Sequence, residues 1–334
     1  MTWLTWRQFR TQAWLVLTAL AALAVALTVT GPNLARLSRS TGLAACQANC
    51  EAAADNFVNQ AMTVVNSRVY VVALVFMFVL PGIIGVFWGA PLIARELETG
   101  THRLIWNQSV TRTRWLAVKL VGVGLVSMVT AGVFSLAVTW WAAPIDKANL
   151  DRMLPMVFPG RGIVPIGYAA FAFVVGVTAG MLVRRTIPAM AVTLVVVVAA
   201  LVATPLYLRP HLVTPVSFTA PLDTSAMQSV RITETDMTVT GQVNQPGAWV
   251  VSNKTVTPSG QPFTGPADLQ TCGRANFSKE GCTAWLASLD LRQQASYQPA
   301  SRFWALQWYE TAVFLALSAL LSAFCFWWVR RRLA

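Results

Sequence analysis

Six long apolar segments constrain the fold of this 334-residue chain more than any other feature. Each is between 17 and 27 residues long, close to the ~20 that a helix needs to cross a bilayer. Only helices and closed barrels span lipid, and long runs without alternation are typical of helices. We therefore expect an all-α polytopic membrane protein with six transmembrane helices, at residues 14–30, 69–92, 115–141, 163–183, 187–208 and 308–329.

Composition agrees with this interpretation. Charged residues make up only 11% of the chain, against ~25% in soluble domains, whereas 55% of the residues are hydrophobic. The net charge of +12 is not evidence for nucleic-acid binding, because the basic residues lie in the gaps between the apolar segments. Lipid is the solvent that such a composition requires.

The distribution of the basic residues predicts the orientation. With the N-terminus inside, the inside segments carry twelve basic and two acidic residues, a net charge of +10, whereas the much longer outside segments carry +2. Positive charge concentrates on the cytoplasmic side of membrane proteins, so both termini are expected in the cytoplasm of a multi-pass cell-membrane protein. The twelve basic residues are Arg7, Arg10, Arg95, Arg103, Arg112, Arg114, Lys119, Arg184, Arg185, Arg330, Arg331 and Arg332.

The chain divides into four parts on this basis. Residues 1–13 place Trp3, Trp6 and Phe9 beside Arg7 and Arg10, a pattern that favours an amphipathic interfacial helix over a frayed tail. Residues 14–208 hold the first five spans, with an inside loop at 93–114. Residues 209–307 form an extracellular insertion of ~100 residues, in which alternation over 229–242 and 248–257 predicts short strands. Residues 308–334 hold the last span and a basic tail.

Four of the five cysteines fall in the outside segments. An oxidising exterior favours the local disulfides Cys46–Cys50 and Cys272–Cys282, with four reduced thiols as the alternative. A zinc site is not expected, because no histidine lies near either pair. Cys325 lies inside the last span.

The sequence shows no catalytic constellation. It has only two histidines and no GxxxxGK[ST] run, so the chain is not expected to be an enzyme and any ATP must be bound by another subunit. Charges inside the spans are nearly absent. Glu310, beside Trp308 and Tyr309, is a weak candidate for a substrate contact, and a place at the headgroup level in an aromatic belt is the favoured alternative.

The inside loop carries the most informative motif. It reads Ala94-Arg95-Glu96-x-Glu98-x-Gly100-Thr101, followed by Ser109-Val110-Thr111-Arg112 and Lys119. This pattern, placed between the second and third spans, resembles the permease subunits of bacterial type V ABC exporters. The long insertion before the last span departs from that family, which often has short re-entrant helices there.

The resemblance implies that the 93–114 loop docks a separate ABC ATPase, which binds ATP and Mg²⁺. It also implies two ATPase copies, a second permease that makes a homodimer, and a path lined by the first, second and fifth spans. The cargo would be apolar or amphipathic, such as a drug, lipid or peptide-like molecule, because the spans offer Phe, Trp and Met. The residues expected to couple to the ATPase are Arg95, Glu96, Leu97, Glu98, Thr99, Gly100, Thr101 and Arg103.

Two other functions stay open at this point. A membrane sensor or scaffold would bind a ligand or partner through residues 209–307, whereas an intramembrane enzyme would need paired carboxylates or histidines that the spans lack.

Two local features bear on the helix bundle. Gly176-x-x-x-Gly180 would allow close helix approach, and Pro81-Gly82 is expected to kink the second span.

Overall fold

The computed structural model describes residues 2–47, 49–101, 111–232, 237–264, 272 and 279–332. The chain forms two compact units. The first comprises Met1–Leu212 and Phe303–Ala334, and the second comprises Val213–Arg302.

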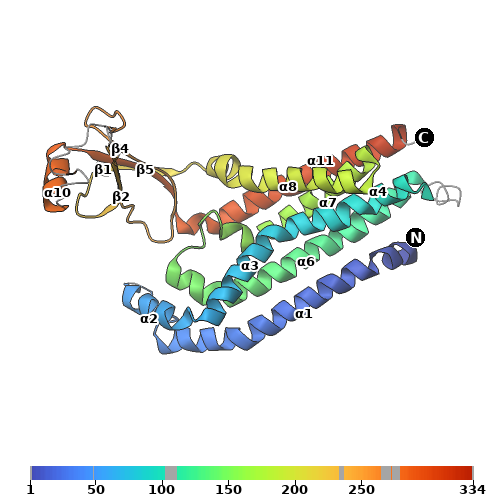
Figure 1. Ribbon diagram of the computed structural model, residues 1–334, viewed down its shortest axis with the longest axis horizontal. Coiled ribbons are helices and arrows are strands. Elements are labelled where there is room, and N and C mark those ends of the chain that lie inside the picture. The colour runs from blue at the N-terminus through green and yellow to red at the C-terminus, as the bar shows by residue number, and fades with distance from the viewer. Residues whose placement is uncertain are drawn as a thin grey trace. The chain divides into compact units, whose positions relative to one another are not determined.

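The first unit is a helix bundle (Figure 1). Its α-helices are α1 (Thr2–Ser40), α2 (Glu51–Ala61), α3 (Val64–Ile83), α4 (Ala90–Glu98), α6 (Arg112–Asn149), α7 (Val164–Val183), α8 (Thr186–Ala203), α9 (Arg209–Leu212) and α11 (Phe303–Arg331). Two π-helical runs, η1 (Ile84–Gly89) and η3 (Thr204–Leu208), follow α3 and α8, and the 3₁₀ turn η2 (Phe158–Gly160) precedes α7.

Five helical runs among the described residues are long and apolar enough to cross a membrane. They are Val65–Glu98, Arg112–Asn149, Val164–Val183, Thr186–Leu212 and Ala300–Arg331. These runs contain the second to sixth predicted spans. The first predicted span lies in α1, where most side chains before residue 21 are outside the described part of the chain, so the sixth crossing stays a prediction.

Several boundaries differ from the expected ones. The backbone of α1 is one uninterrupted helix from Thr2 to Ser40, so residues 2–13 are continuous with the first predicted span and residues 31–40 are not loop. The inside loop is shorter than 93–114, because α4 continues to Glu98 and α6 begins at Arg112. α6 also extends beyond the predicted end at residue 141, through Pro144 to Asn149, and its Trp141 indole nitrogen donates to the Thr30 hydroxyl of α1 at 2.7 Å.

Helix α7 lies at the centre of the bundle, where it contacts α4, α6, α8, α11 and η1 (Figure 1). Most of its length is buried. Small residues explain this position, because glycines let neighbouring backbones approach closely. An added Cβ on Gly176 would lie 2.7 Å from the backbone nitrogen of Ala90 and 2.9 Å from the Cα of Gly89. Close approach through Gly176-x-x-x-Gly180 is therefore present.

The facing surface is a second glycine pair, Gly85-x-x-x-Gly89, in η1. A Cβ on Gly85 would lie 2.7 Å from the Ala172 carbonyl oxygen of α7, and one on Gly180 would lie 2.6 Å from the Ala90 carbonyl oxygen. The π-helical turns begin two residues after Pro81-Gly82, where a kink is predicted. Both kinds of irregularity change the direction of a helix at an identifiable residue.

The second unit is a small mixed α/β domain. Strands β1 (Val216–Pro221), β5 (Arg292–Gln298) and β4 (Trp249–Val256) form an antiparallel sheet in that order, and β2 (Met227–Ile232) pairs with β3 (Met237–Gly241). Helix α10 (Lys279–Ser288) contributes Leu286 to a core that includes Met237 and Val239. The predicted stretches 229–242 and 248–257 thus correspond to β2–β3 and β4.

This unit is shorter than the predicted 209–307 insertion. Arg209 and the segment from Phe303 belong to the bundle instead, because Arg209 pairs with Glu310 and Phe303 packs edge-on against Phe158 at 5.3 Å.

Both predicted disulfides are confirmed, with Cα–Cα distances of 5.8 Å for Cys46–Cys50 and 4.9 Å for Cys272–Cys282.

The glycine contact generates a prediction. Gly176→Ala forces α7 away from η1 and α4, and overpacking of this kind costs about 1–3 kcal/mol, so the detergent-solubilised protein should melt several degrees lower than the parent. Gly122→Ala is the matched control, because an added Cβ there meets nothing within 4 Å. Equal melting temperatures for the two variants would contradict the close approach.

Candidate functional site

One end of the helix bundle collects positive charge. Both chain termini and the end of α4 lie there (Figure 1), and the α7–α8 turn joins them through a contact with Glu98. We call it the basic end. Its described basic residues outside the buried core are Arg95, Arg112, Arg114, Arg184, Arg185, Arg330, Arg331 and Arg332. Helix α2 and the Cys46–Cys50 disulfide lie at the opposite end, which we call the cysteine end.

The last turn of α4 presents part of the predicted coupling motif. Arg95, Glu98 and Thr99 are exposed, whereas Leu97 packs against the bundle core. The Thr99 hydroxyl donates to the Arg95 carbonyl at 2.8 Å. Gly100 follows with a φ of +70°, a left-handed conformation that glycine adopts without strain, so it ends the helix as expected. Arg103 lies outside the described residues.

Glu96, which the motif predicts as part of the coupling surface, is not exposed. Its side chain is buried and pairs with Lys119 of α6, with 2.6 Å between carboxylate oxygen and ammonium nitrogen. The Trp115 indole donates to the same oxygen at 3.0 Å, and Lys119 also donates to the Leu92 carbonyl at 3.1 Å. Burial explains the difference, because a charge leaves water only where a partner neutralises it. Glu96 therefore fixes α4 on α6.

Glu98 lies on the exposed side of the same turn and contacts the N-terminus of α8. One of its carboxylate oxygens accepts from the backbone nitrogen of Thr186 at 2.9 Å and from its hydroxyl at 2.7 Å. Thr186 is the first residue of α8, so this carboxylate satisfies a free donor at a helix N-terminus and meets the positive end of the helix dipole. The two contacts tie α4 to both α6 and α8.

Glu310 lies in a cluster of buried side chains in the first third of α11. It is fully buried, and its two oxygens accept from Arg209 at 2.8 and 3.1 Å, while the Tyr168 hydroxyl donates to it. Arg209 also stacks over the Phe158 ring at 4.2 Å. The place at the headgroup level stays a prediction, and the bidentate arginine fixes the carboxylate inside the bundle. With both oxygens occupied, Glu310 is not a free substrate ligand.

A third buried pair lies near the cysteine end. Arg161 donates to both oxygens of Asp146, at 2.7 and 3.0 Å. In the adjoining α6–α7 loop, burial and then the nearby Asp146 carboxylate raise the pKa of Asp151, which accepts from the Tyr70 hydroxyl at 3.1 Å. The expectation that charges are nearly absent from the spans is therefore incomplete, since three ion pairs lie within the bundle.

None of these charged groups forms a metal-binding cluster within the described residues, where no three His, Cys, Asp or Glu side chains converge. These charged contacts connect elements of the bundle to one another. Among the described residues, two ion pairs and one helix cap join neighbouring helices, and a third ion pair joins α6 to the loop before α7. These contacts leave Arg95 and Thr99 exposed beside the arginines of the basic end.

Comparison with known families decides the class of this bundle. The model of the family described as ABC-2 membrane transporter related matches residues 17–209. The chain belongs to this family. Among curated proteins and solved structures, none matches.

The family match begins at residue 17, within α1, and ends at residue 209, where α9 begins. It therefore includes the whole connection between α4 and α6. It supports a permease-type membrane transporter and an ABC ATPase as its partner. The second unit and α11 lie beyond the matched residues.

Sequence reasoning missed three groups of residues: the Lys119–Trp115 partners of Glu96, the Arg209–Tyr168 partners of Glu310, and the Gly85–Gly89 face. One signal was available, because Lys119 is a lysine within the predicted 115–141 span and such a residue needs a partner. Arg209 carried no such signal, since it stands just past the end of the predicted fifth span.

Lys119→Met tests the buried pair. Loss of the ammonium leaves Glu96 buried without its partner, which costs about 3–5 kcal/mol, so the melting temperature in detergent should fall sharply. The double variant Lys119→Met with Glu96→Gln should recover most of the loss, because it removes both charges. Arg114→Met, at an exposed arginine of the same helix, is the control. A double variant as unstable as the single one would contradict the pairing.

Proposed function

We propose that this chain is the permease half of an ATP-driven exporter. A separate ABC ATPase binds ATP and Mg²⁺ and docks on the surface formed by Arg95, Glu98, Thr99, Gly100 and Thr101, beside the half-buried Leu97 and with Arg103 as part of the same motif. The observation that carries the proposal is the turn at Gly100 within a matched ABC-2 transporter bundle.

The contacts of α4 support a force-transmitting role. A nucleotide-driven subunit can move membrane helices only through an element that does not deform, and α4 is fixed to α6 through Glu96 and to α8 through Glu98. A push on the end of α4 therefore reaches α6 and α8 together. The π-helical run η1 directly precedes α4 in the chain. A transmembrane helix can bend at a π-helical run of this kind.

The charge distribution supports the orientation. In this proposal the basic end faces the cytoplasm, the chain crosses six times with α1 as the first span, and the second unit is extracellular. The Cys46–Cys50 disulfide at the opposite end of the bundle suits an oxidising exterior.

The exposed helix faces support a second permease copy. Ile187 and Val195 of α8 and Tyr207 of the following η3 are each more than two-thirds exposed, although α8 is apolar along its length. Such a surface faces lipid, another subunit or a transport path. In a homodimer, α1, α3 and α8 would line a path for an apolar or amphipathic cargo, with one ATPase under each permease.

The second unit supports the alternative function, a sensor or scaffold. It is a compact domain with its own disulfide and lies beyond the residues that match the family. ATPase association separates the two functions, because a sensor needs none.

Arg95→Glu is the test. The exposed arginine should contact the partner directly, and a charge reversal across an interface costs several kcal/mol, so the amount of P-loop ATPase that co-purifies with the full-length chain should fall at least about tenfold. ATP-dependent transport should fall with it. Arg39→Glu, at an exposed arginine of the cysteine end, should retain both. Absence of any ATPase with the parent chain, or no effect of Arg95→Glu, would contradict the exporter assignment.

A further inference from the structure

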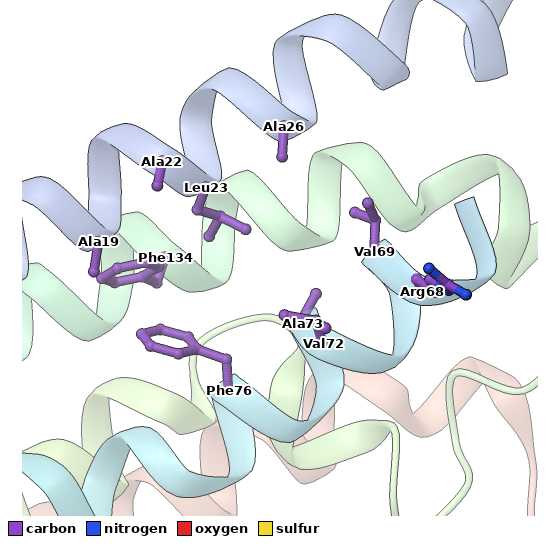
Figure 2. A pocket seen from close by; sticks show the side chains of 10 residues that line it. All are labelled: Ala19, Ala22, Leu23, Ala26, Arg68, Val69, Val72, Ala73, Phe76 and Phe134. Carbon is purple, nitrogen blue, oxygen red and sulfur yellow. The ribbon is translucent and has the colours of Figure 1, made fainter. Parts of the chain in front are cut away.

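An apolar cavity of about 420 Å³ lies between α1, α3 and α6. Figure 2 shows the side chains that line it, with those of α1 facing those of α3 across the space. Its volume falls within the ~300–1,000 Å³ of small-molecule sites in proteins. None of the residues that hold the three ion pairs or the α8 cap lines it.

Small side chains create the space. Ala19, Ala22 and Ala26 stand on one face of α1 at spacings of three and four residues, so Leu23 is the one large side chain that α1 presents among the described lining residues. Phe76 and Phe134 line the inner part, where their rings contact at 4.7 Å between centroids. Two aromatic rings therefore line one part of the cavity, and three alanines with Leu23 line the side formed by α1.

Among the described residues that line the cavity, Arg68 alone is charged. It stands in the first turns of α3, toward the cysteine end, and within the described part of the chain it has no hydrogen bond or ion pair. Its side chain is exposed. A guanidinium at that level can reach the membrane surface and bind a phosphate through two parallel hydrogen bonds.

The dimensions fit one lipid chain. Eight residues separate Arg68 from Phe76 on α3, which corresponds to ~12 Å along a helix. Half of the ~30 Å hydrocarbon core is ~15 Å. The site therefore runs from the headgroup level to the depth that a single acyl chain reaches within its own leaflet.

We propose that this cavity is a binding site for an anionic phospholipid of the leaflet at the cysteine end. One acyl chain fills the space between α1 and α3, down to Phe76 and Phe134, and the phosphate binds Arg68. The lipid completes the packing of α1 against α3, which the alanines alone leave open. The site requires neither an ATPase nor a transported cargo.

The full-length chain in lipid nanodiscs allows a direct test. A phosphatidylglycerol with a photoreactive diazirine in one acyl chain is the probe, and phosphatidylcholine with the same chain is the comparison. After illumination, mass spectrometry should find adducts on α1 and α3 segments that line the cavity, with more from phosphatidylglycerol. Arg68→Gln should lower these adducts by about fivefold, the effect of one basic residue near an anionic lipid surface.

Matched variants separate the cavity from its surroundings. Ala22→Phe fills the space and should abolish the adducts, whereas Ala21→Phe, on the neighbouring exposed position outside the lining, should retain them. Arg39→Gln should also retain them. Equal labelling by the two lipids, or labelling that survives both Arg68→Gln and Ala22→Phe, would mean annular lipid only and overturn the proposal. Arg68→Gln alters an exposed side chain, so it decides the matter even where Ala22→Phe fails to fold.

Discussion

The arrangement of the bundle depends on backbone contact between α7 and the η1–α4 segment. Two glycine pairs face each other there, and any side chain would meet backbone atoms within 3 Å at Gly85, Gly176 and Gly180. In lipid there is little hydrophobic drive between helices, so close packing of this kind supplies much of the attraction. The contact places α7 at the centre and α4 against it, and every other feature of the basic end is built on that placement.

Ion pairs then fix what the glycines bring together. With α4 seated on α7, Glu96 points into the bundle toward Lys119, and Glu98 reaches the first residue of α8. Two carboxylates one helical half-turn apart thus serve opposite purposes, one neutralising a buried lysine and the other capping a helix. Arg95 and Thr99 remain exposed, and in the proposed function these two residues are where the ATPase contacts the rigid element.

Hydrophobic length and the position of charges predicted much of the fold. Five apolar segments coincide with membrane-length helices, and both disulfides form, because those features depend on local composition. The motif around Gly100 indicated the family correctly. The ion-pair partners of buried residues could not be predicted from the sequence. Glu96 and Glu310 could be recognised as unusual, but their partners Lys119 and Arg209 lie 23 residues further and 101 residues earlier in the chain. Such pairing depends on helix rotation, which periodicity alone does not determine.

Site-specific cross-linking at the exposed turn tests the account most directly. The native cysteines leave a low background, since four are in disulfides and Cys325 is buried. A cysteine at Thr99, treated with a short thiol-to-amine reagent in permeabilised native membranes, should join the chain to a P-loop ATPase, whereas a cysteine at Ser259 in the second unit should not. An ATPase adduct from Ser259→Cys, or none from Thr99→Cys, would contradict a cytoplasmic coupling surface at the end of α4.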